Sequence, residues 1–273
     1  MIPKIIHYCW LSDDPIPTNL QNYIDGWKKI MPDYQIIKWD RKRIRLEDHP
    51  FALQAFNDKR YAFAADYVRA FALYTMGGIY LDSDVEVFSR FDDFLDCSYF
   101  TSFETHLNRF QHKLLLNRYI DSNGTRYSDV RKVPDVGLQA AIVGSEKQGA
   151  LITDIYMFYK SQNYIRYNYP FCITAPTVHS RFAEHYGFKY LDIYQELDEN
   201  IHIFPSQVFS SIENFDKSKA VALHVCQGSW LPKRGSLKKV LKRFPCIRDM
   251  YITIKILRNV KKMRSNIIDG FGV

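Results

Sequence analysis

The sequence predicts an α/β fold built around a central, mostly parallel sheet. An apolar segment at residues 2–10 is followed by helical spacing of apolar residues over 18–31, and then by a second apolar segment at 34–39. This strand–helix–strand order is typical of parallel strands joined by a right-handed crossover. The α/β pattern resumes over 137–160. The chain has 273 residues, 47% of them hydrophobic, which is enough to bury a core.

Local signals predict the other elements in chain order. Residues 51–58 and 61–76 have helical patterns, and the glycine pair at 77–78 is expected to end the second helix. Residues 77–88, GGIYLDSDVEVF, have the pattern of a single strand. The remaining expected elements are a polar loop or small subdomain at 105–135, a helix at 176–186, a strand at 220–225, and amphipathic helices starting at 236 and covering 247–268.

Basic charge is concentrated at the C-terminal end. Residues 233–273 contain 12 Lys or Arg and 2 Asp or Glu, a net +10, whereas 1–232 contain 25 and 28, a net −3. We therefore expect one domain over 1–232 and a basic amphipathic helical tail over 233–273. The tail is suited to an anionic membrane surface; the alternative is a helix packed on the domain. Nucleic-acid binding is not expected, because the basic charge does not lie on the folded body.

Cysteine spacing and the absence of long apolar segments indicate the compartment. The five cysteines are widely spaced and form no Cys-x-x-Cys, so neither a disulfide framework nor a zinc site is predicted. No uncharged apolar run reaches the roughly 18–20 residues of a transmembrane helix, and the first residues, MIPKIIHYCW, lack the pattern of a secretory signal. We expect a cytoplasmic protein, with the tail as a candidate for peripheral attachment to the inner face of the membrane.

Three carboxylates follow the apolar core of the 77–88 segment. If the strand continues, Asp82, Asp84 and Glu86 alternate onto one face. Carboxylates about 7 Å apart repel each other, and either water or a cation relieves the repulsion. Hard divalent cations such as Mg²⁺ or Mn²⁺ bind carboxylates and share their remaining positions with phosphates. We favour a metal site over a polar strand edge, because ligands bind at the carboxyl ends of parallel strands.

A second charged pair lies in the preceding helix. Asp66 and Arg69 are three residues apart and therefore share a helix face. Their neighbours are mainly apolar, so a surface salt bridge is the less favoured interpretation. A buried charged pair is costly unless it meets something polar. A sugar hydroxyl or a phosphate group would satisfy that requirement.

The segment FAADYVRAFALYTMGGIYLDSDVEV resembles the signature of the DXD-motif glycosyltransferases. This family includes yeast-type initiating α-mannosyltransferases and bacterial capsule and lipopolysaccharide enzymes, and it is related to the glucosylating domain of large clostridial toxins. IPKIIHYCW, PDYQIIKWD and ALHVCQGSW resemble three further family segments in the same order. The resemblance is good over about 1–104 and looser over 137–232. It implies a GT-A-like (Rossmann-like) catalytic domain, a nucleotide-sugar donor, a divalent cation and retention of anomeric configuration.

The resemblance also assigns roles to individual residues. It implies that Asp84 ligates the metal, that Asp82 contributes to the metal site and contacts the ribose, and that His224 completes the metal shell. Asp66 and Arg69 would hold the hydroxyls and the diphosphate side of the donor sugar. The other assignments are Tyr80 lining the nucleotide pocket, Trp10 stacking on the base, Ser229 and Trp230 near the leaving diphosphate, and Glu104 as a candidate acceptor contact.

Simple packing is the alternative for some of these residues. His224 could be a satisfied core histidine, and Trp10 and Trp230 could serve only the core. The 105–135 segment is expected to be a variable insertion on the acceptor side. The sequence assigns no catalytic nucleophile or base.

The expected function is transfer of a hexose from a nucleotide sugar, with UDP-sugars favoured, to a saccharide acceptor. The pathway expected from the resemblance is synthesis of a surface polysaccharide, capsule or lipopolysaccharide, with a saccharide or lipid-linked glycan as acceptor. The alternatives are a GDP-mannose-dependent mannosyltransferase, a toxin-like protein glycosyltransferase, and a non-catalytic member of the family. A module that binds phosphate or nucleic acid through the basic tail is the alternative outside enzymes.

Overall fold

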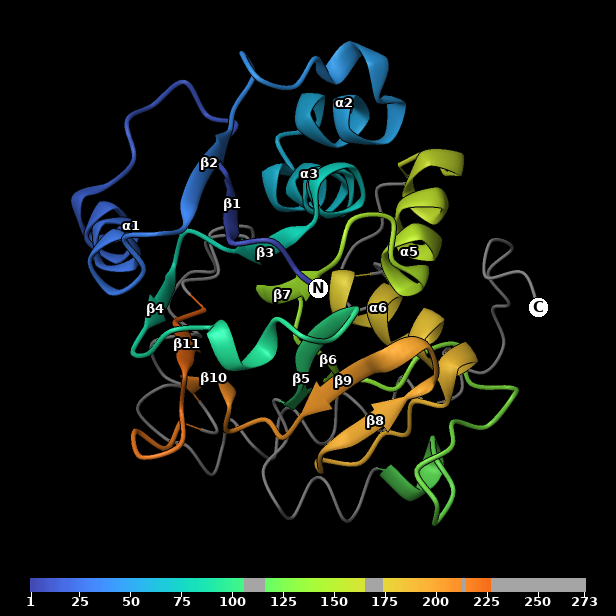
Figure 1. Ribbon diagram of the computed structural model, residues 1–273. Coiled ribbons are helices and arrows are strands. Elements are labelled where there is room, and N and C mark those ends of the chain that lie inside the picture. Colours follow the sequence, from blue (N-terminus) through green and yellow to red (C-terminus); the bar gives the residue numbers. More distant parts are fainter. Residues whose placement is uncertain (106–115, 165–173, 213–214, 227–273) are drawn as a thin grey trace, which may run out of the picture.

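The computed structural model describes residues 1–105, 116–164, 174–212 and 215–226. In this part of the chain an eight-stranded sheet forms the centre of the molecule, in the order β2-β1-β3-β7-β5-β9-β8, with β6 paired to β5 (Figure 1). Its strands are β1 (Ile5–Cys9), β2 (Gln35–Trp39), β3 (Gly78–Leu81), β5 (Tyr99–Thr105), β6 (Val136–Leu138), β7 (Ile142–Ser145), β8 (Gln195–Leu197) and β9 (Ile201–Phe204).

The strand directions confirm a mostly parallel sheet. β1 is parallel to both β2 and β3, and β5 is parallel to β9. β7 lies antiparallel between β3 and β5, while β6 and β8 are antiparallel to their neighbours. β1, β2, β3, β5 and β9 therefore point one way, and β6, β7 and β8 point the other. The carboxyl ends of β1 and β3 lie at the same edge, where α/β folds bind ligands.

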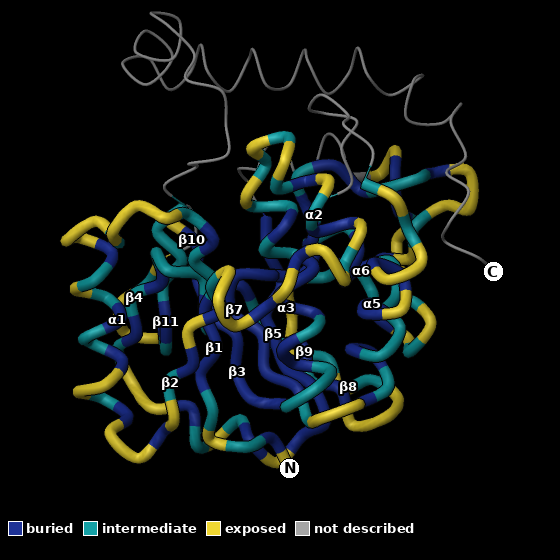
Figure 2. The backbone as a smooth tube through the Cα atoms, turned by 90° about the horizontal axis from the view of Figure 1, so that it is seen from above, coloured by how far each residue is buried: buried dark blue, intermediate teal, exposed yellow. Residues whose placement is uncertain are grey.

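Helices pack on both faces of this sheet. They are α1 (Thr18–Ile30), α2 (Pro50–Asn57), α3 (Tyr61–Met76), α5 (Ala150–Ser161) and α6 (Ala175–Ala183). Buried side chains of α2, α3, α5 and α6 share one core cluster with the sheet, and those of α1 share another. β3 contributes side chains to both clusters. Tyr80 belongs to the first cluster, and Ile79 and Leu81 belong to the second. Figure 2 shows the resulting buried centre around β1, β3, β5 and β7.

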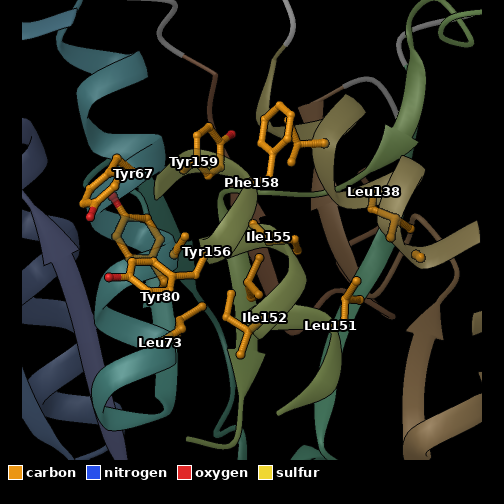
Figure 3. Packing of buried hydrophobic residues seen from close by; sticks show 14 of the residues in the cluster. Tyr67, Leu73, Tyr80, Leu138, Leu151, Ile152, Ile155, Tyr156, Phe158 and Tyr159 are labelled. Atoms are coloured by element: carbon orange, nitrogen blue, oxygen red, sulfur yellow. The ribbon is translucent and has the colours of Figure 1, made fainter. Parts of the chain in front are cut away.

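The first cluster joins α3 and α5 over β3. Tyr67 and Leu73 of α3 face Ile152 and Tyr156 of α5, and the ring of Tyr80 lies between the two helices and the sheet (Figure 3). Tyr67 and Tyr156 meet edge to face, with ring centroids 6.1 Å apart. This packing holds α3 against β3, with the helix face that carries Asp66 and Arg69 turned toward the strand.

A second, three-stranded sheet lies beside the first and completes the α1 side of the core. It consists of β4 (Val85–Val87), β10 (Phe209–Ser211) and β11 (Ala222–His224) in the order β10-β11-β4. β10 is parallel to β11, and β11 is antiparallel to β4. Trp27 of α1 is fully buried and donates its indole N–H to the carbonyl of Val85 over 2.9 Å. This bond holds α1 against the small sheet.

The expectation that 77–88 is one strand with three carboxylates on one face is wrong. β3 ends at Leu81, and Asp82 to Asp84 form a turn in which the Val85 amide donates to the Asp82 carbonyl over 3.0 Å. β4 then joins β11 in the small sheet. The strand breaks because its two halves have different partners, which are distant in the sequence. Asp82 and Asp84 therefore lie in the turn between two sheets, and Glu86 lies apart from them on β4.

The other expected elements agree with the structure where it describes them. The strands near 2–10 and 34–39 and the helices near 18–31, 51–58, 61–76 and 176–186 are present. Of the 105–135 segment, residue 105 ends β5, and Ile120 and Arg126 form an antiparallel bridge around a turn. The sequence pattern did not indicate β5, β8, β9 or β10. The boundary at 232 and both C-terminal helices lie outside the described residues.

None of the helices in the described part of the chain has the length and hydrophobicity that a membrane crossing requires.

Candidate functional site

Two carboxylates and one imidazole converge where the two sheets meet. Asp82 and Asp84 come from the turn after β3, and His224 is the last residue of β11. One ligand atom from each of the three side chains lies within 4.8 Å of the others. His224 Nε2 is 3.4 Å from Asp84 Oδ1 and 4.0 Å from Asp82 Oδ2. The fold therefore brings together the two aspartates of the acidic segment and the histidine that the family resemblance implied.

Backbone bonds hold this geometry. The Asp82 amide donates to the carbonyl of Ala141 over 2.9 Å, which ties the turn to the start of β7. The Val225 amide donates to the carbonyl of Asp84 over 3.0 Å, which ties the turn to the end of β11. The three side chains are thus mounted on both sheets rather than on a loop alone, so their mutual distances depend on the core.

The electrostatics of His224 follow from its carboxylate neighbours. Burial by itself lowers the pKa of the imidazole, but its bonds to Asp84 and Cys226 and the charge of Asp82 raise that pKa more, to well above its usual value. A protonated His224 balances part of the carboxylate charge. A divalent cation would supply that positive charge instead, and the imidazole would lose its proton on ligating it.

The donor set fits a divalent cation. Two carboxylates and one imidazole are ligands that several divalent metals accept. The exposed fractions of the side chains are 29% for Asp82, 16% for Asp84 and 18% for His224. An ion held there would therefore also reach solvent or a bound ligand. Sharing a metal shell between carboxylates and phosphate oxygens is the usual arrangement for Mg²⁺ in nucleotide sites.

A buried arginine extends the cluster into the core. Arg69 Nη1 donates to Asp66 Oδ1 over 2.6 Å, and Arg69 Nη2 donates to Asp82 Oδ1 over 2.9 Å. Its side chain is 4% exposed, and the guanidinium lies over the ring of Tyr80, 4.5 Å from the centroid. Burial acts to lower the pKa of Arg69, but Asp82, Tyr80 and Asp66 raise it well above the usual value, so the charge is retained. The Asp66–Arg69 pair is thus buried, as its apolar helix predicted, and it also bridges to Asp82.

Asp66 is the least hydrated carboxyl of this bridge. Its side chain is 12% exposed. Burial raises the pKa of Asp66 from 3.8 to about 6, and the charge of Arg69 opposes this increase only in part. Asp66 thus holds a proton more tightly in the folded chain than in the unfolded chain. The carboxyl contributes most stability below about pH 4 and loses that contribution as the pH rises to about 6.

The pH dependence of stability should therefore differ between the wild type and Asp66→Asn. We expect the free energy of unfolding of the wild type, relative to the variant, to fall by an amount on the order of 3 kcal/mol between about pH 4 and pH 6. Urea denaturation of both proteins across this range measures the difference. Parallel pH curves would show that Asp66 titrates as it does in the unfolded chain.

Of the other residues that the sequence analysis assigned to the site, those that the structure describes lie outside the Asp82–Asp84–His224 cluster. Tyr80 is 1% exposed and supports Arg69, so the structure does not place it on an open pocket wall. Trp10 follows β1 and donates its indole N–H to the carbonyl of Asp14 over 2.8 Å. Glu104 is buried on β5, opposite Gly137 of β6. Ser229 and Trp230 lie outside the described residues.

His7 is a supporting residue that the sequence analysis missed. It is fully buried on β1, where its Nδ1 accepts the indole N–H of Trp39 over 3.0 Å and its Nε2 lies 2.8 Å from the Gly77 carbonyl. Burial lowers the pKa of His7 to about 4, so the ring is neutral and donates from Nε2. Next to it Gly78 has φ +108°, and a Cβ there would lie 2.6 Å from the Ile5 carbonyl oxygen. His7 and Gly78 together fix the entry into β3.

Cys226 is a second neighbour of the site that the sequence did not indicate, because the spacing of a cysteine shows only whether it suits a disulfide framework or a zinc site. Its sulfur lies 3.3 Å from His224 Nδ1. Whether the side chain of a cysteine contacts that of a histidine two residues before it depends on the local backbone conformation. The sequence spacing alone does not predict this contact.

Comparison with known proteins adds an independent finding. The family described as the glycosyltransferase sugar-binding region containing a DXD motif matches residues 17–101. An uncharacterised glycosyltransferase of Acanthamoeba polyphaga mimivirus is 37% identical over 106 residues, which cover 37% of this chain and 42% of that protein. Inositol phosphoceramide mannosyltransferase 3 of Schizosaccharomyces pombe is 38% identical over 88 residues, covering 31% and 24%. The chain thus spans less than half the length of these relatives.

Solved structures show weaker likeness. The PaToxG glycosyltransferase aligns over 67% of this chain and 69% of its own, with 16% identity and a TM-score of 0.43. A glycosyltransferase involved in glycosylation of the major capsid of PBCV-1 aligns over 81% and 93%, with 10% identity and a TM-score of 0.42. The α/β fold of this chain is established by its own strand order and by the helices packed on its sheet.

Proposed function

We propose that this chain, whose residues 17–101 match the family of DXD-motif glycosyltransferases, is a metal-dependent, retaining enzyme that transfers a hexose from a nucleotide sugar to a saccharide acceptor. The observation that carries the proposal is the convergence of Asp82, Asp84 and His224, linked through Asp82 to the buried Arg69–Asp66 pair. The cluster brings two carboxylates and an imidazole, which suit a divalent cation, beside a buried charged pair that would suit a sugar and a diphosphate.

In this proposal the protein residues have distinct tasks. Asp82, Asp84 and His224 hold the cation, which lowers the cost of negative charge on the leaving nucleoside diphosphate. Arg69 holds Asp82 in one orientation and balances its charge. Asp66, whose side chain is 12% exposed, accepts hydrogen bonds from donor-sugar hydroxyls. Retention is proposed from the family resemblance, and no residue is assigned as nucleophile.

Mn²⁺ is the ion we propose first. Mg²⁺ strongly prefers oxygen ligands, whereas an imidazole beside two carboxylates is also acceptable to Mn²⁺. The nitrogen of His224 is therefore the feature that favours Mn²⁺ over Mg²⁺.

We propose a UDP-sugar as the donor, with GDP-mannose as the second candidate. The second candidate is favoured by the relatives from Schizosaccharomyces pombe and Saccharomyces cerevisiae, which carry the names of mannosyltransferases or of a mannosyl phosphorylinositol ceramide synthase. Those names include a lipid, which also supports a lipid-linked acceptor here. We further propose that the enzyme acts in the synthesis of a surface polysaccharide, capsule or lipopolysaccharide. The basic 233–273 segment would attach it to an anionic membrane.

Nucleotide binding is the direct test. The melting temperature is measured with UDP, GDP, CDP and dTDP, each with and without Mn²⁺. We expect one nucleotide to stabilise the protein only when Mn²⁺ is present, by about 2.7 kcal/mol when the free ligand is at about 100 times its Kd. The responding base then identifies the donor class. The proposal fails if no nucleotide raises the melting temperature at millimolar concentration and no sugar nucleotide is consumed.

A further inference from the structure

Cys226 has an unusual backbone conformation beside the proposed metal site. Its φ is +53°, a value that costs a non-glycine residue about 1 kcal/mol. In this conformation the chain turns back after β11, and the Cys226 sulfur lies 3.3 Å from Nδ1 and 3.5 Å from the carbonyl oxygen of His224. The residue between them, Val225, is bonded to the Asp84 carbonyl. The turn therefore brings the sulfur against the side of the imidazole that faces away from the carboxylates.

The two ring nitrogens of His224 have separate surroundings. Nε2 faces Asp84 and Asp82, at 3.4 and 4.0 Å. A histidine that ligates a metal through Nε2 carries its proton on Nδ1, and the acceptor of that proton fixes both the tautomer and the orientation of the ring. In most metal sites the acceptor is a carboxylate, a backbone carbonyl or water. Here the group placed at Nδ1 is a cysteine sulfur, which is a weak acceptor.

We propose that Cys226 is a positioning residue for His224: its sulfur accepts the Nδ1–H and holds Nε2 toward Asp82 and Asp84. This inference rests on the proposed metal-dependent function. It predicts that the sulfur matters for metal affinity while the side chain contributes little to the stability of the fold. It also explains why a conformation that favours glycine is occupied by a residue with a side chain that reaches the ring.

The test is calorimetric titration of the full chain with Mn²⁺ for the wild type and for Cys226→Ala, Cys226→Ser and Cys226→Gly. Loss of an outer partner of a metal ligand typically weakens metal binding by about 10- to 100-fold, and we expect this range for the alanine and glycine variants. The serine hydroxyl can accept the same proton, so Cys226→Ser should recover much of the affinity. Cys226→Gly also relieves the backbone, so its melting temperature should be unchanged or higher while its Mn²⁺ affinity falls.

Cys97→Ala is the matched control. Cys97 is a buried cysteine whose thiol, like that of Cys226, bonds to a backbone carbonyl, in this case that of Phe94. It precedes β5 and therefore lies at the edge of the sheet opposite the carboxyl end of β3. Its replacement should leave Mn²⁺ affinity unchanged, even if stability decreases.

The outcomes separate this inference from the proposed function. Suppose that the wild type binds Mn²⁺ and that the Kd of Cys226→Ala for Mn²⁺ is within about twofold of the wild-type value, well under the effect expected from loss of such a partner. The positioning role is then wrong, and the metal site stands. If serine binds as weakly as alanine, hydrogen bonding to Nδ1 is not the cause and the inference is also overturned. If the wild type does not bind Mn²⁺ with or without UDP, the metal site itself is wrong, and both proposals fail.

Discussion

Asp84→Asn should reduce metal-dependent sugar transfer by roughly 10³-fold or more in kcat/KM, because in the proposed mechanism it removes a ligand charge where the leaving diphosphate is stabilised. Asp84 lies 3.4 Å from His224 Nε2, and its side chain is only 16% exposed. The substitution keeps the size of the side chain and the turn between the sheets. The loss should therefore be one of function, with folding largely retained.

Glu86 provides the control for Asp84. It belongs to the same acidic stretch, but it lies on β4, opposite Leu223 of β11, and outside the Asp82–Asp84–His224 cluster. Glu86→Gln should retain transfer and the Mn²⁺-dependent nucleotide stabilisation, whereas Asp84→Asn should lose both. Product formation from radiolabelled UDP-sugars or GDP-mannose measures the first, and thermal unfolding measures the second. Full Mn²⁺-dependent activity of Asp84→Asn would remove this residue from the metal site.

Arg69→Met should have the largest effect on stability. Arg69 is 4% exposed and contacts both Asp66 and Asp82, so its removal leaves two carboxylates without their shared counter-charge. Breaking a buried ion pair in this way costs about 3–5 kcal/mol. Transfer should also be lost, since Asp82 is no longer oriented. Urea denaturation at neutral pH measures the free energy of unfolding.

Arg90 offers a matched comparison on the surface. It also bridges two aspartates, Asp33 and Asp92, at 2.8 and 2.5 Å, but its side chain is 40% exposed. Surface pairs contribute little because water screens them, so Arg90→Met should shift the unfolding midpoint far less than Arg69→Met. Adding Asp66→Asn to Arg69→Met should recover part of the lost stability, because it removes one uncompensated carboxylate. Equal effects of Arg69→Met and Arg90→Met would contradict the buried-bridge interpretation.

Local patterns were sufficient for the elements whose partners are near in the sequence. The β1–α1–β2 unit follows from apolar spacing over some forty residues, and α3 follows from its helical pattern and the glycines that end it. The same sequence also showed that Asp66 and Arg69 sit in an apolar helix, and that Asp82 and Asp84 follow an apolar strand. The family resemblance supplied His224. These inferences need residue types and order, and no knowledge of the register between distant strands.

Only the tertiary structure decided where the acidic segment breaks and what its carboxylates meet. β3 pairs with β7, more than sixty residues away, while β4 pairs with β11 near the end of the described chain. β5 and β9, which the sequence analysis missed, likewise pair across about one hundred residues. Arg69 reaches Asp82 because α3 packs on β3, and Cys226 reaches His224 because the backbone turns at φ +53°. Strand pairing and side-chain contact depend on which surfaces are buried together, and local residue patterns do not specify that choice.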